Sequence, residues 1–156
     1  MTPLQAGEPV PDFTLPDDTG GMVELSALRG KPFVLFVYPR DGTQSCTMEA
    51  KAFSSLSSQF RAAGVPLMGL SPDSVEKHRR FKDAAKLDLR LLSDPEHRVI
   101  KSWGCWGEKV QFGRRYMGVI RSTFLVDSDG TLARAWTVTR VAGHAEAVLE
   151  AALGVV

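Results

Sequence analysis

Long apolar runs, excess charge and a secretion signal are all missing from this sequence of 156 residues. No apolar run approaches the roughly 20 residues of a membrane-spanning helix, so we expect no membrane partner. The formal net charge of +1 argues against nucleic acid as a general partner. We interpret the basic run Lys77–Lys82 and the pair Arg114 and Arg115 as solvated surface charge. The first residues, MTPLQAGEPVPDF, lack the basic and apolar segments of a signal peptide.

Cysteine and histidine are also scarce. The two cysteines, Cys46 and Cys105, are too few and too far apart for a disulfide scaffold. This usage is typical of a reducing compartment, and we expect a cytoplasmic protein. The three histidines, His78, His97 and His144, have no metal-ligand spacing with one another or with either cysteine. The sequence therefore predicts neither a metal site nor a structural disulfide.

The remaining composition is that of an ordinary globular protein. Hydrophobic residues make up 44% of the chain and charged residues 24%. No repeat, linker or low-complexity tract interrupts it, and its length suits one domain with a sizeable core. We therefore expect a single domain over residues 1–156.

The most informative stretch runs from Phe33 to Phe53. It opens with the uninterrupted apolar run Phe33–Tyr38, which is typical of a strand buried on both faces in an α/β sheet. Pro39 ends this strand, because proline cannot donate to a sheet ladder. After a polar turn, a helical pattern begins at Cys46. Its apolar residues recur at three- and four-residue spacing: Met48, Ala52, Phe53, Leu56 and Phe60.

Cys46 thus falls in the first turn of a helix that leaves the end of a central strand. Unpaired N–H groups and the positive end of the helix dipole meet there, and both favour a thiolate over a thiol. The thiolate is the reactive form of cysteine, so this position suits a nucleophile. A lone cysteine is more often a small buried hydrophobe. The polar neighbours Ser45 and Thr47, and the start of the helix, argue against that reading here.

The rest of the chain predicts short strands and helices in a definite order. A hairpin is expected over residues 12–25, followed by one helical turn capped by Ser26, and Gly64 is expected to end the Cys46 helix. Strands are expected at 66–71, 122–126 and 132–138, and helices at 74–85, 94–103 and 144–153, the last with Ala147, Val148, Ala151 and Ala152 on its apolar side. This order suits a thioredoxin-like α/β fold, with a central mixed sheet, flanking helices and an N-terminal β-hairpin extension.

The pattern Pro39-x-x-x-Thr43-x-x-Cys46 resembles the active-site signature of the peroxiredoxins, which are thiol peroxidases on a thioredoxin fold. The fuller run YPRDGTQSCTMEA is similar to the bacterioferritin-comigratory, or peroxiredoxin Q, branch. Further family-like runs follow in order over nearly the whole chain: SPDSVEKH, LLSDPEHRV, WGEK, YMGVIRSTFLVD and GHAEAVLEAAL. One short motif would be a weak signal, whereas several in register are specific.

The resemblance implies an enzyme without a cofactor that reduces hydrogen peroxide or an alkyl hydroperoxide. Cys46 would be the peroxidatic thiolate, which attacks the peroxide and becomes a sulfenic acid. Thr43 and Arg121 would orient the peroxide, and the ring of Pro39 would shield the sulfur from water. A guanidinium at Arg121 would also favour the thiolate. Glu49, one turn after the cysteine, is expected to be exposed or paired rather than a catalytic acid.

The recycling half of the cycle departs from the family pattern. Many relatives carry a resolving cysteine five residues after the peroxidatic one, a position that is Lys51 here. Two routes remain open: Cys105 is the candidate resolving residue, or an external thiol attacks the sulfenic acid directly. We favour the external route, with thioredoxin, glutaredoxin or a small thiol as the reductant. The expected assembly is a monomer or a weak homodimer.

Two other classes of function stay open at this stage. A thiol-disulfide oxidoreductase on the same fold is disfavoured because the chain has no CxxC motif. A non-enzymatic binding module that kept the fold would show a Cys46 of ordinary reactivity.

Overall fold

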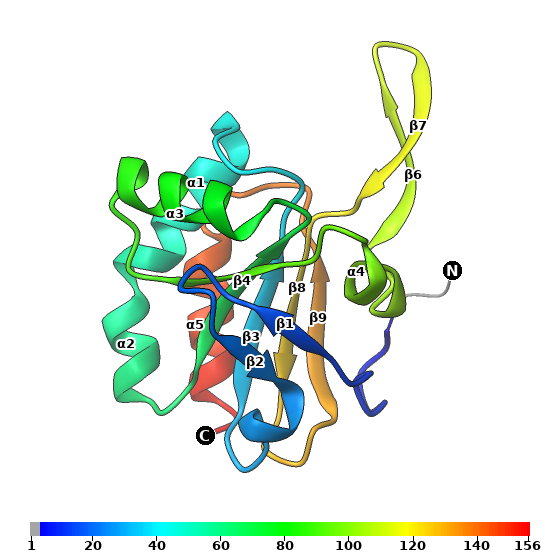
Figure 1. Ribbon diagram of the computed structural model, residues 1–156. Coiled ribbons are helices and arrows are strands. Elements are labelled where there is room, and N and C mark those ends of the chain that lie inside the picture. The colour runs from blue at the N-terminus through cyan, green and yellow to red at the C-terminus, as the bar shows by residue number, and fades with distance from the viewer. Residues whose placement is uncertain (1–3) are drawn as a thin grey trace.

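A computed structural model of the chain describes residues 4–156, so the first three residues of the predicted domain lie outside the described part (Figure 1). The strands are β1 (Thr14–Pro16), β2 (Met22–Glu24), β3 (Phe33–Val37), β4 (Leu67–Ser71), β5 (Arg90–Ser93), β6 (Trp106–Gln111), β7 (Arg114–Val119), β8 (Ser122–Val126) and β9 (Leu132–Thr137). The helices are α1 (Gln44–Ser55), α2 (Ser57–Ala62), α3 (Val75–Ala85), α4 (Arg98–Ser102) and α5 (His144–Leu153), with a 3-10 turn at Leu25–Leu28.

The centre of the fold is a mixed sheet with the strand order β5-β4-β3-β8-β9. Strand β3 pairs in parallel with β4, and β4 in parallel with β5, whereas β8 runs antiparallel to both β3 and β9. All five residues of β3 are buried, as its apolar run predicts. The thioredoxin-like fold with a central mixed sheet and an N-terminal β1–β2 hairpin is therefore confirmed.

The two faces of this sheet support two separate cores, because successive side chains of a strand point to opposite sides. Val34 and Phe36 of β3 belong to a core formed with α1, α2 and α5. Phe33, Leu35 and Val37 belong to the other core, which β1, β2 and α4 cover. Figure 1 shows α1, α2 and α5 on one side of the sheet, with the β1–β2 hairpin and α4 on the other.

The helix that carries Cys46 differs from the prediction at both ends. It begins at Gln44, and it ends at Ser55 rather than at Gly64, because Leu56 leaves the helical conformation before α2 begins. The predicted apolar face is wrong at Met48, which is 49% exposed. That position turns outward one residue before the buried Glu49 and Ala50.

Other boundaries shift, and three strands were not predicted. The 3-10 turn begins at Leu25 without a side-chain cap from Ser26, and α4 starts at Arg98, after Asp94 has accepted N–H bonds from the first turn. On α5 the prediction for Ala147 is wrong, because this residue is exposed. Strand β5 and the hairpin β6–β7 are too short or too polar to give a clear strand pattern in the sequence. The hairpin extends away from the sheet (Figure 1).

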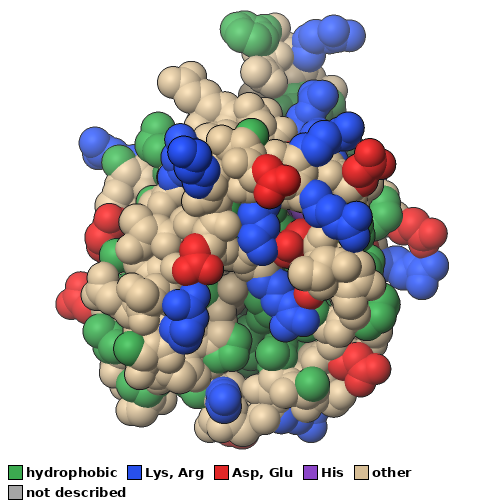
Figure 2. Space-filling view, turned by 60° about the vertical axis from the view of Figure 1, so that its left-hand side comes forward, with side chains coloured by type: hydrophobic (Ala, Val, Ile, Leu, Met, Phe, Trp, Pro, Cys, Tyr) green, Lys and Arg blue, Asp and Glu red, His purple; other side chains and the backbone are tan. Residues whose placement is uncertain are grey.

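The face of the molecule that carries α1, α2 and α3 has no large patch of a single charge sign. In Figure 2, which turns the left side of Figure 1 forward, Lys and Arg side chains are interspersed with Asp and Glu. The interpretation of Lys77–Lys82 as solvated charge is wrong for two members, since His78 and Phe81 are buried.

Within residues 4–156, no helix is both long and apolar enough to cross a membrane.

Candidate active site

The first turn of α1 places Cys46 where the backbone has free donors. Thr43 is the N-cap residue, with extended backbone angles, and its carbonyl accepts the first helical hydrogen bond from Thr47 N at 2.9 Å. Cys46 is therefore the third residue of the helix, within the group of N–H donors that have no partner inside the helix. Its side chain is 2% exposed. The sulfur thus lies at the positive end of the helix in a site largely shielded from water.

Arg121 reaches the sulfur from the edge of β8. Ser122 pairs with Val37 at the end of β3, so Arg121 lies beside the loop that leads into α1. Alternation along β8 puts Arg121 on the same face as Leu125, in the core that contains Cys46. Its Nη2 donates to Cys46 Sγ at 3.2 Å. The structure thus brings together two predicted site residues that are 75 positions apart in the chain.

Glu49 completes the contact on the other side of the guanidinium. Arg121 Nη1 donates to Glu49 Oε1 at 2.7 Å, and the glutamate side chain is 1% exposed. The expectation that Glu49 is paired is confirmed, and the alternative that it is exposed is wrong. Its second oxygen, Oε2, is buried without a hydrogen-bond partner in the described part of the chain. Burial raises the pKa of Glu49 to about 7, against the opposing effect of Arg121.

The loop between β3 and α1 carries the other two predicted residues. Pro39 is half-buried two residues after β3, which ends at Val37, and Thr43 is exposed at the helix start. The Thr43 hydroxyl donates to the carbonyl of Arg40 at 3.3 Å, and it caps no helix N–H. Neither side chain bonds to Cys46, so their proximity to the sulfur rests on the short loop and the first helical turn. A hydroxyl whose proton is engaged in this way still has free lone pairs for an incoming donor.

Sequence reasoning missed the side chains that lie behind this loop. Asp41 is buried, and its two carboxylate oxygens contact Tyr38 Oη and His78 Nδ1, each at 2.6 Å. The Asp41 backbone N–H donates to Asp73 Oδ2 at 2.7 Å. His78 comes from α3 and is fully buried. In the sequence, the only sign of this contact is that His78 stands among the charged residues of a helix.

Two more basic side chains lie close enough to Arg121 to sense its charge. Lys109 of β6 donates from Nζ to the carbonyl of Val119 at 3.0 Å. Burial, and then the charge of Arg121, hold the pKa of Lys109 below its ordinary value, while Cys46 acts in the opposite direction. Burial and Arg121 likewise lower the pKa of His144, the first residue of α5. Lys109 lies in the WGEK run, for which the sequence suggested no individual role.

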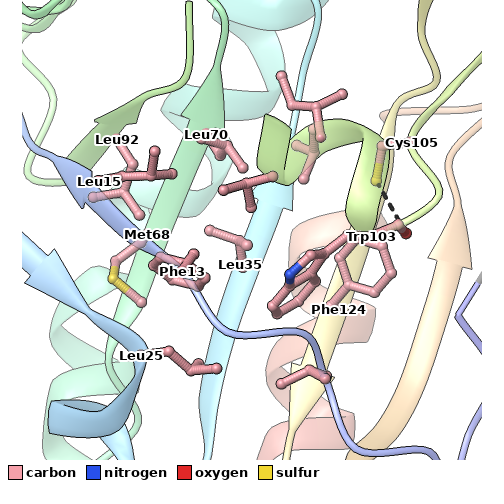
Figure 3. Close-up of a cluster of buried hydrophobic side chains, with 14 of the residues drawn as sticks. Phe13, Leu15, Leu25, Leu35, Met68, Leu70, Leu92, Trp103, Cys105 and Phe124 are labelled. Atoms are coloured by element: carbon pink, nitrogen blue, oxygen red, sulfur yellow. Dashed lines mark hydrogen bonds between the residues drawn. The ribbon is translucent and has the colours of Figure 1, made fainter. Parts of the chain in front are cut away.

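Cys105 is not part of this constellation. It is fully buried in the other core, beside Trp103, and its Sγ lies 3.7 Å from the Trp103 carbonyl (Figure 3). Burial raises the pKa of the Cys105 thiol to about 12, well above the range in which a thiolate forms. Cys46 and Cys105 are both free thiols in cores on opposite faces of the sheet. The structure therefore places Cys105, the candidate resolving residue, in a different core from Cys46.

Comparison with known proteins agrees with this geometry. The chain matches the AhpC/TSA family over residues 6–135. Peroxiredoxin Bcp of Bacillus subtilis is 40% identical over 147 residues, covering 94% of each protein. Peroxiredoxin Bcp of Escherichia coli is 36% identical over 149 residues, covering 96% of each.

Solved structures give the same result. A structure of the bacterioferritin comigratory protein of Xanthomonas campestris, from work on its alkyl peroxide reduction activity, matches with a TM-score of 0.89. Its identity is 33%, and the match covers 96% of this chain and 98% of that one. The chain therefore belongs to the AhpC/TSA family, as a peroxiredoxin of the Bcp or peroxiredoxin Q type.

Proposed function

We propose that this thiol-dependent peroxidase uses Cys46 as its peroxidatic cysteine. The observation that carries the assignment is the position of Cys46 Sγ, in the first turn of α1 and 3.2 Å from the guanidinium of Arg121. A helix N-terminus and a permanent positive charge both stabilise a thiolate. Cys105, the other sulfur of the chain, is buried in the opposite core and lacks a cationic partner among the described residues.

The reaction at Cys46 is a nucleophilic displacement on oxygen. The thiolate attacks one peroxide oxygen, an S–O bond forms and the O–O bond breaks. The leaving oxygen departs as hydroxide or alkoxide and takes up a proton, which gives water or an alcohol. Cys46 is left as a sulfenic acid, oxidised by two electrons. No step requires a cofactor.

Arg121 and Thr43 are assigned to the peroxide rather than to the fold. The guanidinium keeps donors free after its bonds to Cys46 and Glu49, and these donors can stabilise charge on the leaving oxygen. The Thr43 hydroxyl gives its proton to Arg40 O and would accept a hydrogen bond from the peroxide O–H. Pro39 lines the approach and limits access of water. Glu49 holds the guanidinium in place.

The substrates that we assign are hydrogen peroxide and organic hydroperoxides. The relative from Xanthomonas campestris is described by its alkyl peroxide reduction activity.

For recycling we propose a one-cysteine route in a reducing cytoplasm. Lys51 occupies the usual resolving position and is exposed on α1, and Cys105 is on the other side of the sheet. The sulfenic acid at Cys46 would be reduced by thioredoxin, glutaredoxin or a small thiol. The working unit would be a monomer or a weak homodimer.

The decisive experiment is intact mass spectrometry combined with peroxide consumption. Wild-type protein treated with one equivalent of hydrogen peroxide should gain one oxygen, trapped by a sulfenic acid reagent on Cys46. Cys46→Ser should lose both the adduct and the consumption of peroxide. A Cys46→Ser protein that consumes peroxide at a comparable rate would refute the assignment.

A further inference from the structure

Asp41 is the best-anchored residue of the loop between β3 and α1, although it does not touch the sulfur. It lies between Pro39 and Thr43, the two loop residues assigned to the site. Tyr38 Oη donates to its Oδ1, and His78 Nδ1 lies 2.6 Å from its Oδ2. The side chains of His78 and Asp41 are 0% and 1% exposed. This is a dry, fully paired contact directly beneath the loop.

The partners define where the protons are. His78 Nε2 lies 2.8 Å from the carbonyl of Leu92, which can only accept, so this nitrogen carries a hydrogen. Burial, and then Asp41, raise the pKa of Tyr38 well above its ordinary value, so its hydroxyl keeps the proton that it donates. One further proton must lie between Nδ1 and Oδ2. The contact therefore holds one shared proton, and no oxygen or nitrogen in it is left without a partner.

The backbone of Asp41 is fastened separately. Its N–H donates to Asp73 Oδ2, and Asp73 is held in turn by Lys77 Nζ at 2.7 Å and by Ser71 Oγ at 2.9 Å. Burial would raise the pKa of Asp73, but hydrogen bonds from Lys77, the Asp41 amide and Ser71 together hold it below its usual value. The middle of the loop is thus bound to α3 and to the end of β4, two elements that carry no residue of the site.

The loop needs such an anchor because its own backbone does not define its shape. Gly42, between Asp41 and Thr43, has φ +82, and nothing lies within 4 Å of where a Cβ would be. Glycine adopts this conformation without strain, but it adopts many others as readily. Contacts of the neighbouring Asp41 side chain must therefore select the conformation in which the Thr43 hydroxyl bonds the carbonyl of Arg40.

We propose that Asp41 and His78 are positioning residues for peroxide reduction, which hold the Pro39–Thr43 loop in the shape that binds the peroxide. This assignment rests on the proposed function. Cys46 and Arg121 are held by α1, β8 and Glu49, so the reactivity of the sulfur itself does not depend on the loop. Removing the anchor should therefore slow the reaction with peroxide but leave the thiolate nearly as nucleophilic as before.

Two substitutions of Asp41 separate its position from its charge. In Asp41→Asn, the amide can donate to Nδ1 of a neutral His78, and its oxygen can still accept from Tyr38. All three side chains then keep their places without the shared proton. In Asp41→Ala both side-chain contacts are lost, and only the backbone bond to Asp73 still anchors this residue. His78→Asn serves as the second variant: its amide nitrogen takes the place of Nδ1 and keeps a donor toward Asp41, but the bond to Leu92 O is lost.

The experiment compares two reactions of Cys46, with hydrogen peroxide and with iodoacetamide, a small reagent that needs a thiolate but no peroxide site. Asp41→Ala should react with peroxide on the order of tenfold to a hundredfold more slowly, since a small misplacement has this effect. Its alkylation rate should stay within about threefold of wild type. Asp41→Asn should stay within about threefold in both reactions, and the peroxide rate of His78→Asn should fall between those of the two Asp41 variants.

Val99→Ala, a substitution in the other core, is the control for a general loss of stability. The urea midpoint of every variant is measured, so that each peroxide rate can be compared with the stability of the same protein. The inference is wrong if Asp41→Ala loses no more peroxide reactivity than Val99→Ala, or if its two reactions slow in parallel. It is also wrong if Asp41→Asn is as slow as Asp41→Ala. Should Asp41→Ala not fold, His78→Asn decides by the same two rates. A wild type that is alkylated but does not consume peroxide would instead refute the proposed function itself.

Discussion

At the scale of single residues, the guanidinium of Arg121, which lies just before β8, links a sulfur and a carboxylate that both lie on α1. It bonds Cys46 Sγ at 3.2 Å and Glu49 Oε1 at 2.7 Å. A donor that is fixed in this way does not have to reorient when negative charge develops on the leaving oxygen. The same bond gives the sulfur a cationic partner before the reaction begins.

Arg121→Ala should therefore lower the rate of peroxide reduction on the order of a hundredfold or more. The alkylation rate of Cys46 near neutral pH should fall as well, because a nearby positive charge is lost. Rapid-mixing kinetics with limiting peroxide measure the first rate, and iodoacetamide measures the second. Arg115→Ala is the matched control, since the Arg115 side chain is 79% exposed on the β6–β7 hairpin. Rates within a few-fold of wild type in Arg121→Ala would make Arg121 a bystander.

Glu49 predicts a specific pH dependence of stability. Its pKa is about 7 in the folded protein against an ordinary 4.5, because burial disfavours the carboxylate. Between these values the unfolded chain releases the proton and the native protein keeps it. The stabilisation from this group is therefore complete below pH 4.5 and is lost as the pH rises through 7.

Glu49→Gln cannot ionise, so its stability relative to wild type should rise between pH 4 and pH 8, by about 3 kcal/mol at most. Urea unfolding of both proteins at the two pH values gives this difference, and other titrating groups cancel in the comparison. A difference that does not change with pH would show that Glu49 has the same protonation in both states.

At the scale of elements, Thr43 stands at the start of α1 and could act on the helix or on the substrate. A substitution at this position distinguishes the two roles. Thr43 is the N-cap residue, but its hydroxyl caps no helix N–H. Thr43→Ala should therefore lose clearly less than the ~1 kcal/mol of a typical cap deletion. Its peroxide rate should fall by about tenfold or more, because an oriented acceptor is lost.

Thr43→Ser keeps the hydroxyl and should restore most of that rate, which makes it the control. Urea unfolding and peroxide kinetics on the same preparations measure the two effects. A Thr43→Ala protein with lower stability and a normal rate would instead identify the residue as a helix cap.

The elements that the sequence predicted are those with a strong local pattern. The apolar run of β3 and the apolar side of α5 are visible without any partner, and the bounds of α5 agree with the prediction. Strand β5 has a single pair of leucines, Leu91 and Leu92, and it is ordered by pairing with β4. The hairpin β6–β7 has mostly exposed residues, so its sequence lacks alternation.

The site was predictable only as far as its motifs reach. Cys46, Thr43 and Pro39 lie in one short run, and Arg121 follows from the family pattern around RSTF. The contact between Asp41 and His78 spans 37 residues and depends on how α3 packs beside the loop that follows β3. No periodicity in the sequence carries that information, because the partner of a buried polar residue is decided by the packing of elements.

At the scale of the whole molecule, the sheet keeps the two cysteines in different surroundings. Cys46 shares a core with α1, α2 and α5, and Cys105 shares one with β1, β2 and α4. A disulfide requires Cα atoms within about 7 Å, which cysteines packed on opposite faces of one sheet are not placed to meet. The fold therefore favours recycling by an external thiol.

Cys105→Ser should accordingly keep most of the thiol-dependent turnover. Wild-type protein given peroxide without reductant should accumulate sulfenic acid or over-oxidised Cys46, which intact mass spectrometry detects. Cys46→Ser, which lacks the peroxidatic sulfur, serves as the control for the mass shift. A stoichiometric Cys46–Cys105 disulfide in the monomer, together with loss of turnover in Cys105→Ser, would contradict this expectation.

The projecting β6–β7 hairpin also offers a site at which a protease can cut the folded chain in two. Arg114 and Arg115 follow the fully outward Phe112 at its tip, where trypsin should cut before it reaches lysines and arginines inside helices. The two pieces should co-elute on gel filtration under native conditions, because β3 in one is paired along its length with β8 in the other. They should separate only in denaturant, and an Arg114→Gln, Arg115→Gln double variant should resist the cut. On this expectation the hydrogen bonds of the sheet hold the two pieces together, and the folded chain does not need covalent continuity through the hairpin.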